Sequence, residues 1–323
     1  MIIVLPVSRT DDEVKDDFIR IFKLFGSYDE HDLVLVCRPH DYAYARDVYT
    51  SVRDIGFNKT THWVFEDNGR RGWPGGPNHY WHETVKYLQE DYGGDRQQPW
   101  LWLEMDMTPL KHGWLDDLQQ EYDNSSKPFM GNLQWTTTTT SEKEMLKLCQ
   151  HLVGAAIYPP AGDMDKYSKL WSKVNKVNTA WDVLLQWELP QHAHETELIQ
   201  MLFRTGNYKK IEDKNGGYII QGEDREPWPD PTYTFSKPVD IETAAVVHGC
   251  NDGSLARLIY EEETGGKIEE NPSGDILDGE ITYGEPVSIS PKRKLPVFFH
   301  VPKCAGTYTY NIIFRTIKKY ISN

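Results

Sequence analysis

Hydrophobic and polar positions follow two alternating patterns along the first third of the chain. Short runs rich in β-branched and aromatic residues predict strands at 2–7, 32–38, 61–67 and 99–106. Between these runs, apolar residues recur at helical spacing and predict helices at 11–26, 42–55 and 79–92. Strands that alternate with helices favour a largely parallel sheet with helices on its faces. In such sheets ligands bind beyond the carboxyl ends of the strands, so the residues that follow each strand are candidate site residues.

The pattern changes after Asp106. A short helix is predicted at 112–122, strands at 127–133 and 151–159, and a helix at 178–191 that Pro190 stops. The threonine run at 136–140 predicts a flexible loop. Strands that follow each other without a helix between them indicate that the second half joins the sheet with mixed polarity. The predicted fold is therefore α/β, a Rossmann-like mixed sheet flanked by helices.

Composition narrows the class of protein. With 39% hydrophobic and 26% charged residues the chain is globular, and no apolar run reaches the roughly 20 residues that a membrane helix needs. The apolar start, 1–7, lacks a basic lead-in and a cleavage site, which indicates a first strand and not a signal. A net charge of −14 argues against nucleic acid as a partner. The four cysteines form no CxxC pair, which predicts neither a disulfide framework nor a zinc site, and favours a cytoplasmic location.

The end of the chain differs from the rest. From Glu261 to Lys294 it is acidic and rich in Gly, Pro and Ser without apolar periodicity, which indicates a linker. An apolar run, a Gly-containing loop and a helical stretch then follow. The sequence thus predicts a domain at 1–260, a linker at 261–294 and a short strand-loop-helix tail at 295–323.

Two carboxylates, Glu104 and Asp106, stand at alternate positions where the fourth predicted strand ends. Residues two apart in a strand point to the same face, so both carboxylates can reach one hard divalent cation. Such an ion can bind the phosphates of a sugar nucleotide and neutralise the charge on a leaving diphosphate. An acidic pair also begins many solvated loops, so the pair by itself does not decide between the two roles.

The stretch PWLWLEMDMTPLKHGW, residues 99–114, resembles the metal-binding segment of GT-A glycosyltransferases. The shared features are an apolar strand, an acid-x-Asp pair, a proline and a helix that begins at Gly-Trp, and the likeness extends over roughly residues 1–258. Glu104 departs from the family, which usually has Asp there. The resemblance implies a metal-dependent glycosyltransferase of class EC 2.4, with Mn²⁺ or Mg²⁺ held by Asp106 and Glu104. It also implies a UDP- or GDP-sugar as donor and a hydroxyl acceptor, a glycan or another molecule.

The resemblance also implies donor-binding positions outside the acidic pair. These are the loop after the first strand, the end of the third strand and the start of the third helix: Pro6, Val7, Ser8, Asp67, Asn68 and Asn78. Local structure offers a second explanation for two of them, because Ser8 and Asn78 are also suited to cap the helices that follow. Arg70 and Arg71 are candidates to bind the diphosphate, or are solvated.

Two further residues gain a role through the resemblance. His248, in TAAVVHGCNDG, resembles the His of the C-terminal His-Gly strand that completes the metal site in several GT-A families, although a lone His is usually structural. Manganese accepts a mixed carboxylate and imidazole set readily. Asp182 resembles the general base of inverting members, yet the helix dipole also favours an acid there, so a retaining mechanism stays open. Trp135, Trp181 and Trp187 are candidate platforms for sugar rings, or core residues.

The tail segment HVPKCAGTYTYN, residues 300–311, resembles the phosphosulfate-binding loop of sulfotransferases that use 3′-phosphoadenylyl sulfate. Its Lys303 and the amides around Gly306 suit an anion. Only 14 residues follow Thr309, too few for the rest of that fold, which favours a truncated fragment over a sulfotransferase. Two alternatives to a glycosyltransferase therefore stay open: an inactive nucleotide-sugar or carbohydrate-binding module, and the remnant of a bifunctional glycosyltransferase-sulfotransferase.

Overall fold

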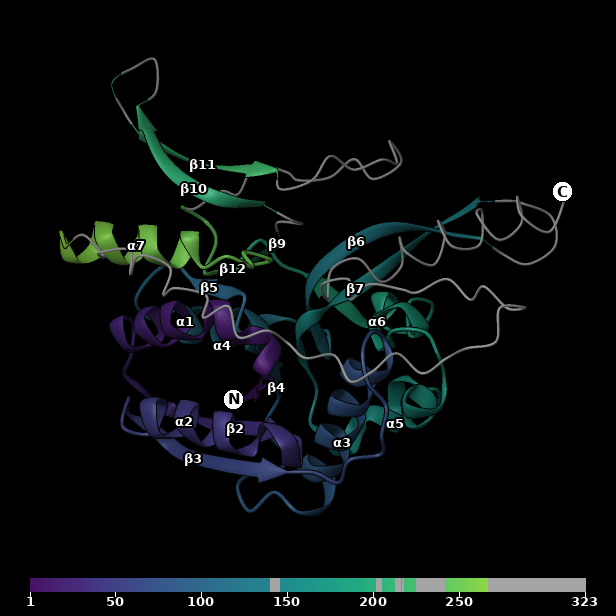
Figure 1. Ribbon diagram of the computed structural model, residues 1–323. Coiled ribbons are helices and arrows are strands. Elements are labelled where there is room, and N and C mark those ends of the chain that lie inside the picture. Colours follow the sequence, from purple (N-terminus) through teal and green to yellow (C-terminus); the bar gives the residue numbers. More distant parts are fainter. Residues whose placement is uncertain (140–145, 202–204, 213–215, 217, 225–241, 267–323) are drawn as a thin grey trace, which may run out of the picture. The chain divides into compact units, whose positions relative to one another are not determined.

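A seven-stranded sheet forms the centre of the compact unit Met1–Glu263 (Figure 1). The structure is a computed structural model and describes residues 1–139, 146–201, 205–212, 216, 218–224 and 242–266. The strands, in order across the sheet, are β3 (Phe57–Val64), β2 (Tyr28–Cys37), β1 (Ile2–Pro6), β4 (Trp100–Trp102), β7 (Leu146–Tyr158), β6 (Phe129–Thr139) and β8 (Ala193–Glu195). The predicted sulfotransferase-like tail lies outside the described residues.

The first four strands are parallel, and the later ones make the sheet mixed. β1 lies between β2 and β4 and runs parallel to both, whereas β7 is antiparallel to β4 and β6. Three helices connect the parallel strands: α1 (Asp12–Leu24), α2 (Tyr42–Val52) and α3 (Gly75–Glu90). The strand order reverses between β1 and β4, so the carboxyl ends of these two strands border the crevice where such sheets bind ligands. The mixed sheet with helices on its faces confirms the predicted fold class.

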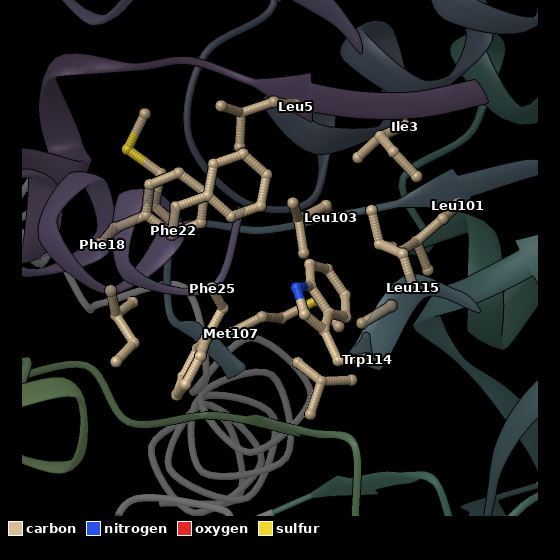
Figure 2. Packing of buried hydrophobic residues seen from close by; sticks show 14 of the residues in the cluster. Ile3, Leu5, Phe18, Phe22, Phe25, Leu101, Leu103, Met107, Trp114 and Leu115 are labelled. Carbon is tan, nitrogen blue, oxygen red and sulfur yellow. The ribbon is translucent and has the colours of Figure 1, made fainter. Parts of the chain in front are cut away.

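Alternating side chains divide the core into two layers, one on each face of the sheet. Ile3 and Leu5 of β1 face α1, where Phe18 and Phe22 stack with ring centroids 4.9 Å apart (Figure 2). On this side α2, α4 (Trp114–Asn124) and α7 (Ser254–Thr264) complete the layer. Each fully buried side chain of this size contributes about 1.5–3 kcal/mol to folding. This packing therefore fixes the strands of the sheet on the face that α1 covers.

The opposite layer is unusually rich in tryptophan. Trp100 and Trp102 of β4 pack there with Trp81 of α3, and all three are at most 1% exposed. Trp100 also stacks on Tyr158 of β7, with ring centroids 4.4 Å apart. The strand that leads into the acidic pair is thus fixed by large rigid rings on one face, and by Leu101 on the other.

A smaller sheet of three strands continues from the end of β4. It consists of β5 (Met107–Pro109), β12 (Val246–His248) and β9 (Ile199–Met201), with β12 in the middle. A separate hairpin is formed by β10 (Thr205–Glu212) and β11 (Tyr218–Asp224). Among the described helices, none combines the length and the apolar character that crossing a membrane requires.

Several predicted elements differ from the observed ones. The fourth strand ends at Trp102, because a turn in which the Met107 amide donates to the Glu104 carbonyl at 2.9 Å separates β4 from β5. The threonine run was wrong as a loop: through Thr139 it belongs to β6, where β-branched residues fit well. The helix predicted at 178–191 is reduced to α6 (Trp181–Leu184) and the turns after it.

The helix α7 extends beyond the predicted end of the domain at residue 260. It runs through Thr264, and its apolar side is buried at Leu255 and Ile259. The acidic residues that suggested a linker from Glu261 form its last turn. The division into domain, linker and tail otherwise stays a prediction.

Candidate metal centre

The connection between β4 and β5 and the end of β12 bring three potential metal ligands together. Glu104 and Asp106 lie in the connection, and His248 ends β12. The β5–β12 register pairs His248 with Met107, which places the imidazole beside Asp106. The Asp106 carbonyl accepts the amides of Gly249 and the residue after it, at 3.2 and 3.3 Å. Gly249 has φ +105°, a backbone conformation that suits glycine and lets the chain fold back over the pair.

The three side chains converge on one point. His248 Nε2 lies 3.3 Å from Asp106 Oδ1 and 3.4 Å from Glu104 Oε2. One ligand atom from each residue lies within 4.8 Å of the others. Ligands about 2.0–2.2 Å from a divalent ion can be about 4 Å apart, so these separations suit a single ion. The indole of Trp102 donates to Glu104 Oε1 at 3.0 Å and orients that carboxylate.

Two carboxylates and an imidazole share a largely buried space. Burial lowers the pKa of His248, but Asp106 and Glu104 outweigh it and hold that pKa well above its ordinary value. A proton on His248 thus balances part of the negative charge. His248 Nε2 and Asp106 Oδ1 form an ion-pair contact. In the described part of the chain, Asp106 Oδ1 and His248 Nδ1 are buried polar atoms without a hydrogen-bond partner.

The loop after β1 offers little of its surface to a ligand. Pro6 and Val7 are buried, and the Val7 carbonyl accepts the hydroxyl of Tyr80 at 3.1 Å. Ser8 is partly exposed and caps a short 3₁₀ helix by accepting the Thr10 amide at 3.4 Å. Three residues of this loop were predicted to bind the nucleotide-sugar donor, and Ser8 is the one that is partly exposed. Ser8 also caps the short helix, which was the alternative explanation for it.

Asp67 and Asn68 follow β3, as predicted, but both are bonded to protein groups. The carboxylate of Asp67 forms a two-pronged pair with the guanidinium of Arg71, which holds the pKa of Asp67 well below its usual range. The amide of Asn68 donates to His79 Nδ1 at 3.0 Å and to Asn175 Oδ1 at 3.1 Å. These contacts tie the loop after β3 to α3 and to the segment around residue 175.

Asn78 has a structural position. It lies in the first turns of α3, which begins at Gly75, so the prediction that Asn78 caps this helix was wrong. The side chain is fully buried, its amide donates to the carbonyls of Val174 and Thr179, and its oxygen accepts the Trp181 amide at 2.9 Å. All three hydrogen bonds hold the segment before α6 against α3.

The side chain of Arg70 also forms hydrogen bonds within the protein. Its guanidinium donates to the backbone carbonyls of Asn175 and Val177. With Arg71 paired to Asp67, both arginines predicted as candidates for the diphosphate have protein partners. Polar contacts therefore join the loop after β3 to α3 and to the segment around residue 175.

Asp182 lies in α6, close to a residue that the sequence did not single out. Its Oδ2 is 3.9 Å from Nε2 of His151 on β7. His151 is 6% exposed, and its Nδ1 is a buried atom without a partner among the described residues. The available signal was a histidine at the start of the apolar run HLVGAAIYP.

Of the three candidate tryptophans, Trp135 lies on β6, and the other two lie in different environments. Trp181 is 3% exposed and packs edge-on to Trp102, with ring centroids 5.7 Å apart, so it is a core residue and not a platform for a sugar ring. Trp187 is 52% exposed and stays a candidate for contact with an acceptor.

Comparison with known proteins adds a partial likeness of fold. No protein-family model matches the chain, and no curated protein matches it in sequence. It is similar to the galactosyltransferase LgtC in complex with donor and acceptor sugar analogues (TM-score 0.45, 13% identity, 84% of this chain and 98% of that chain). It is also similar to a 4-diphosphocytidyl-2C-methyl-D-erythritol synthase (0.34, 14%, 54% and 82%). A third similar structure is TarS of S. aureus in complex with UDP (0.36, 15%, 57% and 53%). These likenesses carry no statement about chemistry, which depends on the side chains.

Proposed function

We propose that the chain is a metal-dependent glycosyltransferase that moves a sugar from a nucleotide-sugar donor to a hydroxyl acceptor. The observation that supports this most is the convergence of Glu104, Asp106 and His248 where β4 ends, next to β1. The position is the reversal point of the strand order, where sheets of this kind bind nucleotides. The sequence around the acidic pair resembles the corresponding segment of GT-A glycosyltransferases.

The residues present fit a divalent cation. Asp106 Oδ1 is buried without a hydrogen-bond partner among the described residues, and the His248 imidazole lies 3.3 Å from it, so both atoms are available to a cation once His248 loses its proton. Two carboxylates suit Mg²⁺ and Mn²⁺, and the imidazole of His248 favours Mn²⁺. When bound, such an ion neutralises charge on the diphosphate of a UDP- or GDP-sugar.

Side chains of the protein supply the other functions that the proposed reaction needs. Glu104 and Asp106 hold the donor end of the site, with Glu104 oriented by Trp102. In the proposed reaction the acceptor oxygen bonds to the anomeric carbon, and the carbon-oxygen bond to the diphosphate breaks with its electron pair on the diphosphate. The hydroxyl proton passes to the carboxylate of Asp182, the general base predicted for an inverting enzyme.

Calorimetry with UDP and GDP, each with and without Mn²⁺, tests the proposal. We expect one nucleotide to bind in a Mn²⁺-dependent manner, and Asp106→Ala to weaken that binding at least about 100-fold, since a directly coordinating carboxylate is lost. A matched control is Asp117→Ala, which removes a surface carboxylate paired with Lys111 at 2.7 Å. Equal nucleotide affinity in wild type and Asp106→Ala would refute the metal centre.

Slow hydrolysis of the donor separates a transferase from a binding module. A competent transferase passes some sugar to water when no acceptor is present, whereas a binding module does not. Incubation of the protein with the UDP- or GDP-sugar selected by calorimetry, followed by quantification of released sugar, gives the answer. Tight Mn²⁺-dependent binding without sugar release would favour the binding module.

A further inference from the structure

A second pair of ionisable residues lies close to the metal centre. Asp182 Oδ2 and His151 Nε2 are 3.9 Å apart, and their side chains are 16% and 7% exposed. Asp182 is partly exposed, whereas His151 is buried. Ionisable groups that are nearly buried cost free energy unless they are paired, and they cluster at functional sites. This pair is therefore a candidate for a functional role.

The position of Asp182 is fixed by its neighbours. The backbone amide of Trp181 donates to the buried side chain of Asn78, and the Trp181 indole donates to Tyr158 at 3.2 Å. The Trp181 ring lies against Trp102, whose own indole holds Glu104. A short chain of contacts therefore connects Trp181, the residue before Asp182, to Glu104 of the metal centre.

The charges around the pair act in opposite directions. Burial raises the pKa of Asp182, Glu104 adds to this increase, and His151 opposes it. Burial lowers the pKa of His151, while Asp182 and the backbone of Gln134 on β6 oppose that decrease. Burial raises the pKa of Tyr158 on β7, and the charge of Asp182 adds to this increase. The two lysines of the neighbouring 3₁₀ helix Trp171–Lys176 are exposed to solvent.

We infer that His151, which contacts Asp182 at 3.9 Å inside the protein, is a positioning residue for that carboxylate, so that it can accept a proton from a hydroxyl nucleophile beside the metal centre. This inference rests on the proposed glycosyl transfer and adds a residue to it. Without His151, the nearly buried carboxyl group of Asp182 would retain its proton to higher pH and would be a poorer base. The nucleophile is a sugar or other alcohol hydroxyl, and water in the absence of an acceptor.

This role is tested by the pH dependence of donor hydrolysis. The assay contains Mn²⁺ and the UDP- or GDP-sugar whose nucleotide binds in calorimetry. Asp182→Asn should lower kcat at least about 100-fold. His151→Gln should keep KM and move the acidic limb of the kcat profile up by about 1 pH unit, because loss of His151 removes the effect that lowers the pKa of Asp182. His194→Gln is the matched control, since His194 pairs with Glu121 at 2.8 Å and lies on β8.

A second measurement keeps the inference testable if His151→Gln folds poorly. In ¹⁵N NMR titrations, the imidazole of His151 should titrate at lower pH in Asp182→Asn than in wild type, because the carboxylate raises the pKa of His151. An unchanged His151 titration, or an unchanged acidic limb in an active His151→Gln enzyme, would overturn the inference and leave the glycosyltransferase proposal intact. Failure of the glycosyltransferase proposal is distinguishable from this, because the wild type would then show no Mn²⁺-dependent nucleotide binding or no donor cleavage.

Discussion

Two polar regions lie beyond the carboxyl ends of the parallel strands, and they differ in how their hydrogen-bonding groups are used. In the metal centre after β4, an oxygen of Asp106 and a nitrogen of His248 are buried without hydrogen-bond partners in the part of the chain that the structure describes. In the loop after β3, by contrast, Asp67 is paired with Arg71, and Arg70 is bonded to backbone carbonyls. Both regions have the composition of a ligand site. In the first, Asp106 and His248 keep buried atoms that a cation could use.

The difference indicates what separates a structural polar cluster from a binding one. A buried donor or acceptor without a partner costs about 1–3 kcal/mol, and where it faces other potential metal ligands a cation can supply the missing contact. A cluster whose members bond to one another stabilises the fold and gains little from a ligand, because binding would first have to break those bonds. The predictions below measure this difference, first in the metal centre and then in the loop.

The largest effect is expected from His248→Ala. If His248 coordinates the cation with Asp106, the variant should lose at least about 100-fold in Mn²⁺ affinity, while the metal-free protein keeps its fold. Calorimetry with Mn²⁺ measures the affinity, and thermal melting with and without Mn²⁺ measures stability. A variant that melts at a lower temperature without metal but binds Mn²⁺ like wild type would make His248 a core residue.

The charge on His248 adds a pH dependence with a defined sign. Because its folded-state pKa is raised, the protonated imidazole stabilises the metal-free protein fully below the unfolded pKa of about 6.5, and this contribution is lost as pH rises through the folded value. A cation must displace that proton. Mn²⁺ affinity should therefore increase with pH between about 5.5 and 8, and this increase should be absent in His248→Ala.

Asn78→Ala probes the loop side of the comparison and should act on stability. It removes the partner of two backbone carbonyls and one backbone amide inside the protein, which should lower the free energy of unfolding by about 3 kcal/mol. Gln89→Ala, on the same helix, removes one bond to the Ala161 carbonyl and should cost less. Denaturant unfolding compares the two. A loss of nucleotide affinity in Asn78→Ala at unchanged stability would instead place Asn78 in the donor site.

Local pattern predicted much of the fold and part of the site. The apolar runs at β1 to β3 and the helical spacing in α1 are local signals, and they located these elements to within a few residues. The acidic pair was found in the same way, at the end of a strand held by tryptophans. The physical reason differed: a turn, and not strand alternation, brings Glu104 and Asp106 together, because β4 ends at Trp102.

Contacts between distant parts of the chain could not be predicted from the same signals. Asn78 looks like a helix cap from its neighbours, whereas its partners lie about 100 residues further along. The Arg70 partners at Asn175 and Val177 are equally remote. His151 was missed because its meaning depends on Asp182, which α6 places against β7. A polar residue's role is decided by whether such partners reach it, and sequence spacing does not show that.

The smallest effect is expected from Arg71→Ala, and it decides whether the loop after β3 takes part in binding. An arginine that bound the diphosphate would be worth at least about tenfold in nucleotide affinity, so unchanged affinity is the result that the pairing with Asp67 predicts. The variant should instead show a small loss of stability with a distinct pH dependence. Arg71 depresses the pKa of Asp67, so the pair stabilises the protein above the unfolded Asp pKa of about 3.9, and the contribution is lost as pH falls. Melting curves of wild type and Arg71→Ala should therefore differ slightly at neutral pH and converge in acid. A tenfold loss of affinity for UDP or GDP would show that the ion pair opens for the ligand, and that a fully bonded cluster can still be part of the site.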